Sequence, residues 1–429
     1  MDAVAGRVVA APSPDGIGSA PPDARPSGKS RLALPLAGAI GSYGLWSAFL
    51  ATTTSLFLAD ALHVTPLAIG LFFTVRGVAA IVINLVAGRI SDRLPDRRLM
   101  LGIAGAGGAG AGLCFAMLRD YPAVLVLGAL CYSVGGIAYS QLFAYANELA
   151  RAGGGGQAVT TFTSVMRSVF CASWVIGPPL GLFLLTRYGF WPLYLATAGL
   201  SLVTGALGQR GLRRIPARSA LADPAADRTT ASGSGPGPRL AARTWLLLGA
   251  VIVLSAVNQM YNIDVALYVT KDLRIGAQFV GWMAGLSAAL EIRITIIAGR
   301  LAARAGTLRV TLAAAAVATV FFCLLPLAAT APALLALQPL NAAWTAVALS
   351  IPMVMVQEEA PGGAGAASAL YGSAFMAAVM LAGAITGVTA TAVGYGNVFW
   401  VCAALSAAAG GLLLARTARP LRGRAPAFS

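Results

Sequence analysis

Twelve long apolar runs, separated by short polar segments, constrain what this chain can fold into more than any other feature of its sequence. Six runs occupy residues 32–209 and six occupy residues 244–415. Each is close to the roughly 20 residues that an α-helix needs to cross a membrane. Of the 429 residues 58% are hydrophobic and only 10% are charged, whereas soluble domains are about 25% charged. The sequence therefore predicts an all-α membrane protein with twelve transmembrane helices in two six-helix halves.

Three polar segments lie outside the apolar runs. Residues 1–31 are rich in Pro, Gly, Ser and Ala and lack the apolar core of a signal peptide, so we expect a disordered cytoplasmic arm. Residues 210–243 carry seven arginines among Pro, Gly, Ser and Thr, which predicts a cytoplasmic linker between the halves. Residues 416–429 form a basic cytoplasmic tail. The expected order is arm, half at 32–209, linker, half at 244–415 and tail.

The basic residues are unevenly distributed. In a soluble protein the net charge of +15 would suggest nucleic-acid binding. With the N-terminus in the cytoplasm, however, 23 of the 30 lysines and arginines fall in cytoplasmic segments and only 4 fall in the outer loops. Membrane proteins carry this excess on the cytoplasmic side. We therefore expect both termini in the cytoplasm and no nucleic-acid partner. The Ala-, Gly- and Arg-rich composition suggests a GC-rich bacterial genome, and hence a bacterial cytoplasmic membrane.

Catalytic and metal-binding patterns are missing from the sequence. The five cysteines fall inside apolar runs without the spacing of metal ligands, and the only histidine, His63, lies in the first outer loop. No nucleophile set and no carboxylate pair stands at a working distance within one span. We therefore expect no enzymatic activity, no cofactor and no metal site.

A similar turn recurs at the same place in both halves. Residues 88–98, between the second and third runs, read Gly-Arg-Ile-Ser-Asp-Arg-Leu-Pro-Asp-Arg-Arg, and a weaker echo occupies residues 299–309. The repeat indicates two halves related in sequence order. We predict that the glycine lets the two helices turn closely. We also predict that the first aspartate caps a helix or pairs with an arginine, which would latch one conformation. The residues of this motif are Gly88, Asp92, Arg93, Arg97 and Arg98.

These features together resemble the major facilitator superfamily of transporters. Shorter stretches are similar to its sugar efflux transporters, above all Ser-Val-Met-Arg at residues 164–167 and Trp-Val-Ile-Gly-Pro-Pro-Leu at residues 174–180. The resemblance implies a proton-driven exporter of sugars or glycosides that works by alternating access, with a cavity lined by spans 1, 4, 7 and 10. Two residues depart from the family pattern: Arg293 stands where proline is usual, and Arg76 where an uncharged polar residue is frequent.

Five charged residues lie inside the apolar runs, where charge is costly and by default indicates function. Arg167 and Glu291 sit at similar depths, roughly 10–12 Å from the cytoplasmic side at 1.5 Å per residue, and the resemblance places their spans face to face. We predict that they pair when the protein is closed to the cytoplasm, and that protonation of Glu291 weakens the pair. The alternative is a permanent ion pair that only fixes packing.

The other three charges have more open interpretations. Asp264, near the outer end of its run, is predicted to bind a sugar hydroxyl, to carry a proton, or to cap the helix beside Lys271. Arg76 lies mid-span, where its side chain cannot readily reach the membrane surface, so we expect it to face the cavity or a partner helix. An anionic sugar group is one reason for such a position. Arg293 lies nearer the cytoplasm and is expected to extend toward it.

Sugar sites combine hydrogen bonds to hydroxyl groups with flat rings against C–H faces, and the runs expected to line the cavity carry both. Polar side chains also join helices to one another in lipid, so each of these residues has a structural alternative. The candidate substrate-binding residues are Tyr43, Trp46, Gln141, Asn258, Tyr261, Asn262, Asp264, Gln338, Asn341 and Trp344. The candidate proton-coupling and gating residues are Arg76, Arg167, Asp264 and Glu291.

The alternative function is that of a multidrug/proton antiporter of the same superfamily. Such a protein would need an apolar, aromatic cavity in place of the Asn and Gln clusters. In either case we expect a small-molecule substrate, protons and the lipid bilayer as partners, and a monomer.

Overall fold

The computed structural model describes residues 28–93, 98–151, 156–212, 242–359 and 363–417. Within these residues there are twelve helical spans long and apolar enough to cross a membrane, and no strand. The predicted fold class is therefore confirmed. The predicted tail beyond residue 417, most of the linker, and the arm up to residue 27 lie outside the described residues, as does Arg97 of the loop motif.

The first half contains six spans in chain order. The fourth span is a continuous run of a short α-helix, a π-helical turn and a long α-helix. The elements are α1 (Gly28–Asp60), α2 (Pro66–Arg93), α3 (Arg98–Met117), α4 (Tyr121–Ala123) with η1 (Val124–Gly128) and α5 (Ala129–Arg151), α6 (Gly156–Tyr188) and α7 (Phe190–Leu212).

The second half repeats this order. Its first span ends in a π-helical turn, its third in a 3₁₀ turn, and its fourth is divided into three helices. The elements are α9 (Ala242–Leu267) with η3 (Tyr268–Asp272), α10 (Ala277–Ala305), α11 (Thr307–Leu324) with η4 (Leu325–Leu327), α12 (Ala331–Ala336), α13 (Gln338–Ala348) and α14 (Ile351–Glu359), α15 (Gly363–Val393), and α16 (Tyr395–Thr417).

Three single glycines connect consecutive spans. Gly189 lies between α6 and α7, Gly306 between α10 and α11, and Gly394 between α15 and α16, with φ of 85°, 91° and 88°. A residue in this left-handed region ends a helix most easily when it lacks a Cβ atom. These one-residue turns keep the neighbouring spans antiparallel and close.

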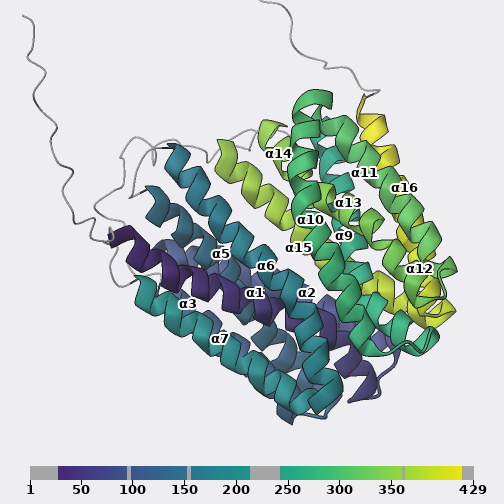
Figure 1. Cartoon of the computed structure of the whole chain (residues 1–429), viewed down its shortest axis with the longest axis horizontal. Helices are drawn as coiled ribbons and strands as arrows, with labels where there is room; N and C mark the ends of the chain where they lie inside the picture. Colours follow the sequence, from purple (N-terminus) through teal and green to yellow (C-terminus); the bar gives the residue numbers. More distant parts are fainter. Residues whose placement is uncertain (1–27, 94–97, 152–155, 213–241, 360–362, 418–429) are drawn as a thin grey trace, which may run out of the picture.

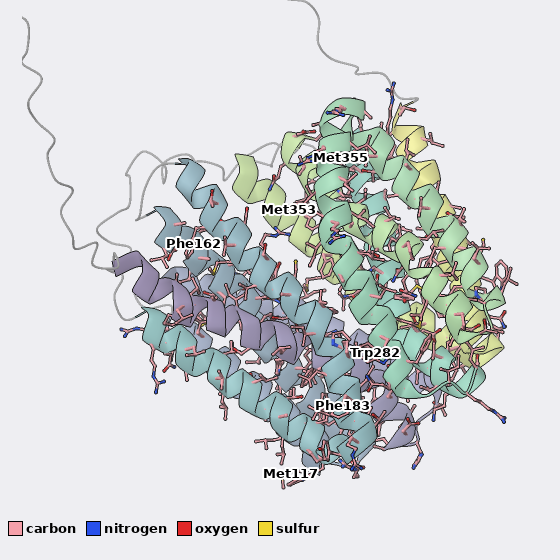
Figure 2. The ribbon with its side chains drawn as sticks, viewed as in Figure 1. Met117, Phe162, Phe183, Trp282, Met353 and Met355 are labelled. Carbon is pink, nitrogen blue, oxygen red and sulfur yellow. The ribbon has the colours of Figure 1, made fainter. Side chains whose placement is uncertain are left out.

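Aromatic rings fill the core of each half, while large apolar side chains also cover its outside. Phe57, Phe115 and Tyr194 pack together in the first half with ring centroids 5.2–5.4 Å apart. Trp282 is 58% exposed and Phe183 is 49% exposed, and Figure 2 shows both near the join of the two halves. A water-soluble surface would not carry so many large apolar groups, whereas lipid accommodates them. The chain is therefore a multi-pass membrane protein.

Because each span reverses direction, the bundle has two ends. We call "linker end" the end where α1 and α9 begin and where α7 and α16 finish, and "far end" the opposite one. The halves meet through α2 against α15 and α6 against α10, with α1 beside α9. Figure 1 shows the helices of the two halves converging toward the far end and diverging toward the linker end.

Candidate substrate site between the two halves

An ion pair joins the two halves at the far end. The Lys271 ammonium group, in η3, contacts the Asp60 carboxylate at the end of α1. Asp272, the next residue, accepts a hydrogen bond from the backbone N–H of Gly396 at 3.1 Å and so ties η3 to α16. The first span of each half is thus held to the other at this end.

Glycines bring the backbones of the two halves into direct contact near the far end. A Cβ atom on Gly70 of α2 would lie 2.4 Å from the Cα atom of Gly387 in α15, and one on Gly383 would lie 2.6 Å from the backbone nitrogen of Thr74. Small residues allow this approach between membrane helices.

The second contact uses the prolines of α6. A Cβ atom on Gly281 of α10 would lie 2.9 Å from the Cα atom of Pro179. The side-chain amide of Gln278 donates to the Pro179 carbonyl at 3.2 Å. Although Pro178 and Pro179 lie inside it, α6 runs as one helix from Gly156 to Tyr188. The far end is therefore closed along both seams between the halves.

A small cavity lies between the halves. It has a volume of about 20 Å³, lies among α1, α9 and α10, and is bordered by Thr52, Tyr261 and Asn262. Such a volume holds about one water molecule, so this cavity does not accommodate an organic solute in the described conformation.

The first half presents aromatic rings from α1, α5 and α6. Tyr43 stacks on Trp46 and on Phe170, with centroids 5.5 and 6.2 Å apart, and Tyr139 lies 5.4 Å from Phe170. Tyr139 is exposed and is within electrostatic range of Arg167. Tyr371 of α15, in the other half, is within electrostatic range of both residues. We call Tyr43, Tyr139 and Phe170 the aromatic wall.

The second half contributes a polar network centred on Asn341 of α13. The Asn341 amide group donates to Ser287 of α10 at 3.0 Å and to Gln338 at 3.2 Å, and its oxygen accepts from the Trp344 indole at 3.1 Å. A longer contact of 3.4 Å reaches the Tyr261 hydroxyl group of α9. These groups satisfy one another inside the half, which joins three spans and leaves few bonds free for a substrate.

Two asparagines of α9 lie closer to the other half. Asn262 donates from its amide group to the Asn258 carbonyl at 3.0 Å and to the Asn258 side chain at 3.3 Å. Asn262 is half-buried and borders the small cavity with Thr52 of α1. Through Asn262, this pair reaches the small cavity that α9 shares with α1 of the first half.

Arg167 and Glu291 are not joined in this conformation. Among the described residues neither has an ion-pair partner, although both lie within electrostatic range of Cys171, which is in α6 one turn after Arg167. Arg167 is exposed and Glu291 is half-buried. The predicted pairing concerns the conformation closed at the linker end, so it stays a prediction.

Asp264 lies in the core of the second half. It is 0% exposed, and neither carboxylate oxygen has a hydrogen-bond partner among the described residues. Cys402 of α16 is within electrostatic range of it. Lys271 pairs with Asp60 instead. In this conformation the Asp264 side chain therefore contacts no solvent, and its role in binding a sugar or a proton stays a prediction.

A comparison with known families identifies the fold. The family model of the Major Facilitator Superfamily matches residues 36–263 and again residues 247–429. The chain belongs to the major facilitator superfamily. The first match spans α1–α7 and extends into α9, and the second spans α9–α16, so the family pattern occurs twice, in agreement with the repeat of the six spans.

Relatives of this chain are transporters. Sugar efflux transporter A of Escherichia coli is 34% identical over 371 residues, which cover 85% of this chain and 91% of that protein. Sugar efflux transporter B of Salmonella typhimurium is 34% identical over 360 residues, which cover 83% and 88%.

Solved structures of transporters share the fold. The nucleoside transporter NupG superposes with a TM-score of 0.72 at 15% identity, covering 91% of this chain and all of that one. A bacterial homologue of the iron transporter ferroportin, in an inward-facing state, superposes with a TM-score of 0.69 at 15% identity, covering 91% and 98%. The family match and the relatives at 34% identity make the chain a transporter and not an enzyme.

Other predicted site residues are buried within one half of the bundle. Trp46 is 1% exposed, and its indole N–H donates to the Gly108 carbonyl of α3 at 3.3 Å, so it belongs to the core of the first half. Gln338 is fully buried and donates to the Leu334 carbonyl at 3.0 Å. Gln141 is buried in α5 and has an interaction partner.

The prediction that Gly88 lets the second and third helices turn closely is wrong. Helix α2 continues through it to Arg93, and a Cβ atom at Gly88 would meet nothing within 4 Å. It therefore makes no close turn, because the helix ends five residues later. The side chains of Asp92 and Arg93 lie outside the described part of the chain, whereas Arg98 begins α3 and has an interaction partner. The latch by Asp92 stays a prediction.

Sequence reasoning did not select two residues of the candidate site. Phe170 contributes to the aromatic wall, and Ser287 accepts from Asn341. Tyr139, the third ring of the wall, is among the residues that the fourth span offers to a solute. Phe170 and Ser287 are single apolar or small polar residues within apolar runs, and nothing in their pattern distinguishes them.

Proposed function

We propose that this protein is a proton-coupled secondary transporter that exports sugars or glycosides across the bacterial cytoplasmic membrane by alternating access. The observation that carries the proposal is the similarity to sugar efflux transporters, which extends over 85% of the chain and so includes both halves. A contact closed at one end of the bundle, with helices that diverge at the other, fits a protein whose halves rock around a central solute.

The linker end is proposed to face the cytoplasm. Arg89 of α2 and Arg300 and Arg304 of α10 are exposed near this end. Basic residues gather on the cytoplasmic side of membrane proteins. In this orientation the described conformation is open toward the cytoplasm and closed toward the outside, ready to take up a solute for export.

The aromatic wall and the Asn258–Asn262 pair are proposed to hold the sugar. Flat rings cover the C–H faces of a sugar, and side-chain amides can both donate to and accept from neighbouring hydroxyl groups. Asn262 lines one cavity with Thr52 of the first half, and Tyr139 of the aromatic wall is within electrostatic range of Tyr371 of the second half. A solute between them would contact both halves, as alternating access requires.

Glu291 is proposed to couple proton movement to the cycle. In the described conformation it has no basic partner. Closure of the linker end would bring α6 and α10 together there and place Arg167 beside it. A carboxyl group that exchanges an open setting for an ion pair binds and releases protons as the conformations interchange. Asp264 is the second candidate.

The test is solute flux in inside-out membrane vesicles with an imposed pH gradient, acid inside. Wild type should accumulate labelled sugar or glycoside only while the gradient persists, and Glu291→Gln should abolish accumulation. Glu358→Gln is the matched control, because Glu358 is an exposed carboxylate at the end of α14. Gradient-driven flux that survives in Glu291→Gln but not in Asp264→Asn would move the proton site to Asp264.

The multidrug/proton antiporter remains the second candidate, and the aromatic wall is the observation that favours it. Extrusion of apolar cations in the same vesicles, without sugar flux, would support it and overturn the sugar proposal.

A further inference from the structure

Arg76 is a cation inside a membrane span that faces the protein rather than the lipid. Val78 and Val82, which are 44% and 54% exposed, mark the lipid side of α2. At 3.6 residues per turn, Arg76 points about 200° away from Val78 and therefore toward the interior. Its guanidinium group lies 3.9 Å from the ring centroid of Tyr132 in α5, and Tyr43 of α1 is within electrostatic range.

No acidic residue in the described part of the chain pairs with Arg76. None of the ion pairs among the described residues includes it, and no described residue accepts a hydrogen bond from its guanidinium group. Its Nε atom is buried, whereas the terminal nitrogens remain accessible beside the aromatic wall. The stacking on Tyr132 recovers only part of what it costs to place an arginine deep in a membrane span.

An anionic group on the solute would supply what the protein lacks. The N–H edge of a guanidinium group matches two oxygens of a carboxylate or phosphate, and the accessible terminal nitrogens of Arg76 can offer such an edge. We propose that Arg76 binds such a group, and that the transported solute is therefore an acidic sugar, either a sugar acid or a sugar phosphate. That the solute contains a sugar ring rests on the proposed function, whereas its negative charge is inferred from Arg76.

The position of Arg76 gives such a solute a defined orientation. Its acidic group would meet Arg76 between α2 and α5, with its ring against the aromatic wall. Its remaining hydroxyl groups would point toward the Asn258–Asn262 pair of the other half. Arg76 is followed by Gly77, where a Cβ atom would lie 2.9 Å from the Cα atom of Met380 in α15. A charge bound by Arg76 would therefore lie close to the contact between α2 and α15, which joins the two halves.

The experiment measures binding to the purified full-length protein by calorimetry. The probes are glucose, glucuronate, glucose 6-phosphate and benzoate, so that charge and sugar ring are varied separately. Wild type, Arg76→Gln, Arg76→Lys and the control Arg187→Gln are compared. Arg187 also lies near a tyrosine ring, 5.9 Å from that of Tyr188, but at the far end of α6.

Wild type should bind glucuronate or glucose 6-phosphate at least about 10-fold more tightly than glucose, because a charge-assisted hydrogen bond is at stake. Arg76→Gln should remove this difference, Arg76→Lys should keep part of it, and Arg187→Gln should keep all of it. Which of the two acids binds distinguishes a carboxylate from a phosphate. The wild-type preference is measured without any variant, so poor folding of Arg76→Gln would not remove the test.

Two results would overturn one proposal and spare the other. Equal affinity of wild type for glucose and both acids would overturn the role of Arg76, while the sugar transporter stands. Binding of benzoate that depends on Arg76, without binding of any sugar, would overturn the sugar function and keep the anion site. Binding of none of the four probes would count against both.

Discussion

The crossing of α2 and α15 sets how tightly the far end can close. In the described conformation Gly70 and Gly387 touch through their backbones, and a Cβ atom at position 70 would lie 2.4 Å from the Gly387 Cα atom. Ordinary contact begins near 3.4 Å, so Gly70→Ala places its methyl group about 1 Å too close. The atoms that it meets are backbone and cannot rotate away, so the two helices must separate.

The energetic consequence follows from this overlap. Overpacking by one methyl group costs about 1–3 kcal/mol when the surroundings cannot relax. In the proposed alternating-access cycle, the cost would fall only on the conformation in which the far end is closed, because the two glycines would separate when that end opens. A bias of this size changes the ratio of the two conformations by about 5- to 150-fold. Gly70→Ala should therefore favour the conformation open at the far end.

Spin labels on the two halves would measure the shift. Thr186 of α6 and Thr330, before α12, are exposed at the far end and can carry labels once the five native cysteines are replaced. Gly70→Ala should increase the population with long label distances. Gly136→Ala is the matched control, because a Cβ atom at Gly136 meets nothing within 4 Å. Identical distance distributions for the two variants would refute the reasoning.

Three further predictions concern polar contacts. The Asp60–Lys271 pair is half-exposed, so Asp60→Asn should change the ratio of short to long label distances by only about 2- to 5-fold. High salt should have the same effect on wild type. Asn341→Ala leaves several buried groups unpartnered and should destabilise the protein by about 2–4 kcal/mol, seen as a lower Tm in detergent. Glu359→Gln leaves Arg416, which is 4% exposed, without its ion-pair partner and should lower the free energy of unfolding by about 3–5 kcal/mol. Adding Arg416→Met should recover part of the lost Tm, and no recovery would contradict an ion-pair role.

The sequence by itself determined the twelve spans and their division into halves. All twelve predicted runs became helical spans, and the glycines that separate three pairs of spans lie at the expected boundaries. The physical reason is that lipid cannot hydrogen-bond to the backbone, so any apolar run of sufficient length must form a helix. This constraint is local and leaves few alternatives.

Only the tertiary structure decided which side chains of each helix face a partner, the lipid or the solute. Tyr43 and Trp46 lie one turn apart on α1 and are 8% and 1% exposed, and Trp46 is buried more deeply because Gly108 and Gly135 leave room for its ring. Asn341 and Asn262 are the same residue type, but one is saturated by its own half and the other borders the space between the halves. Arg167 and Glu291 are apart in the described conformation, and their pairing in a conformation closed at the linker end stays a prediction. Orientation and conformation arise from packing between spans far apart in the chain, and the helical pattern of a single span carries no record of them.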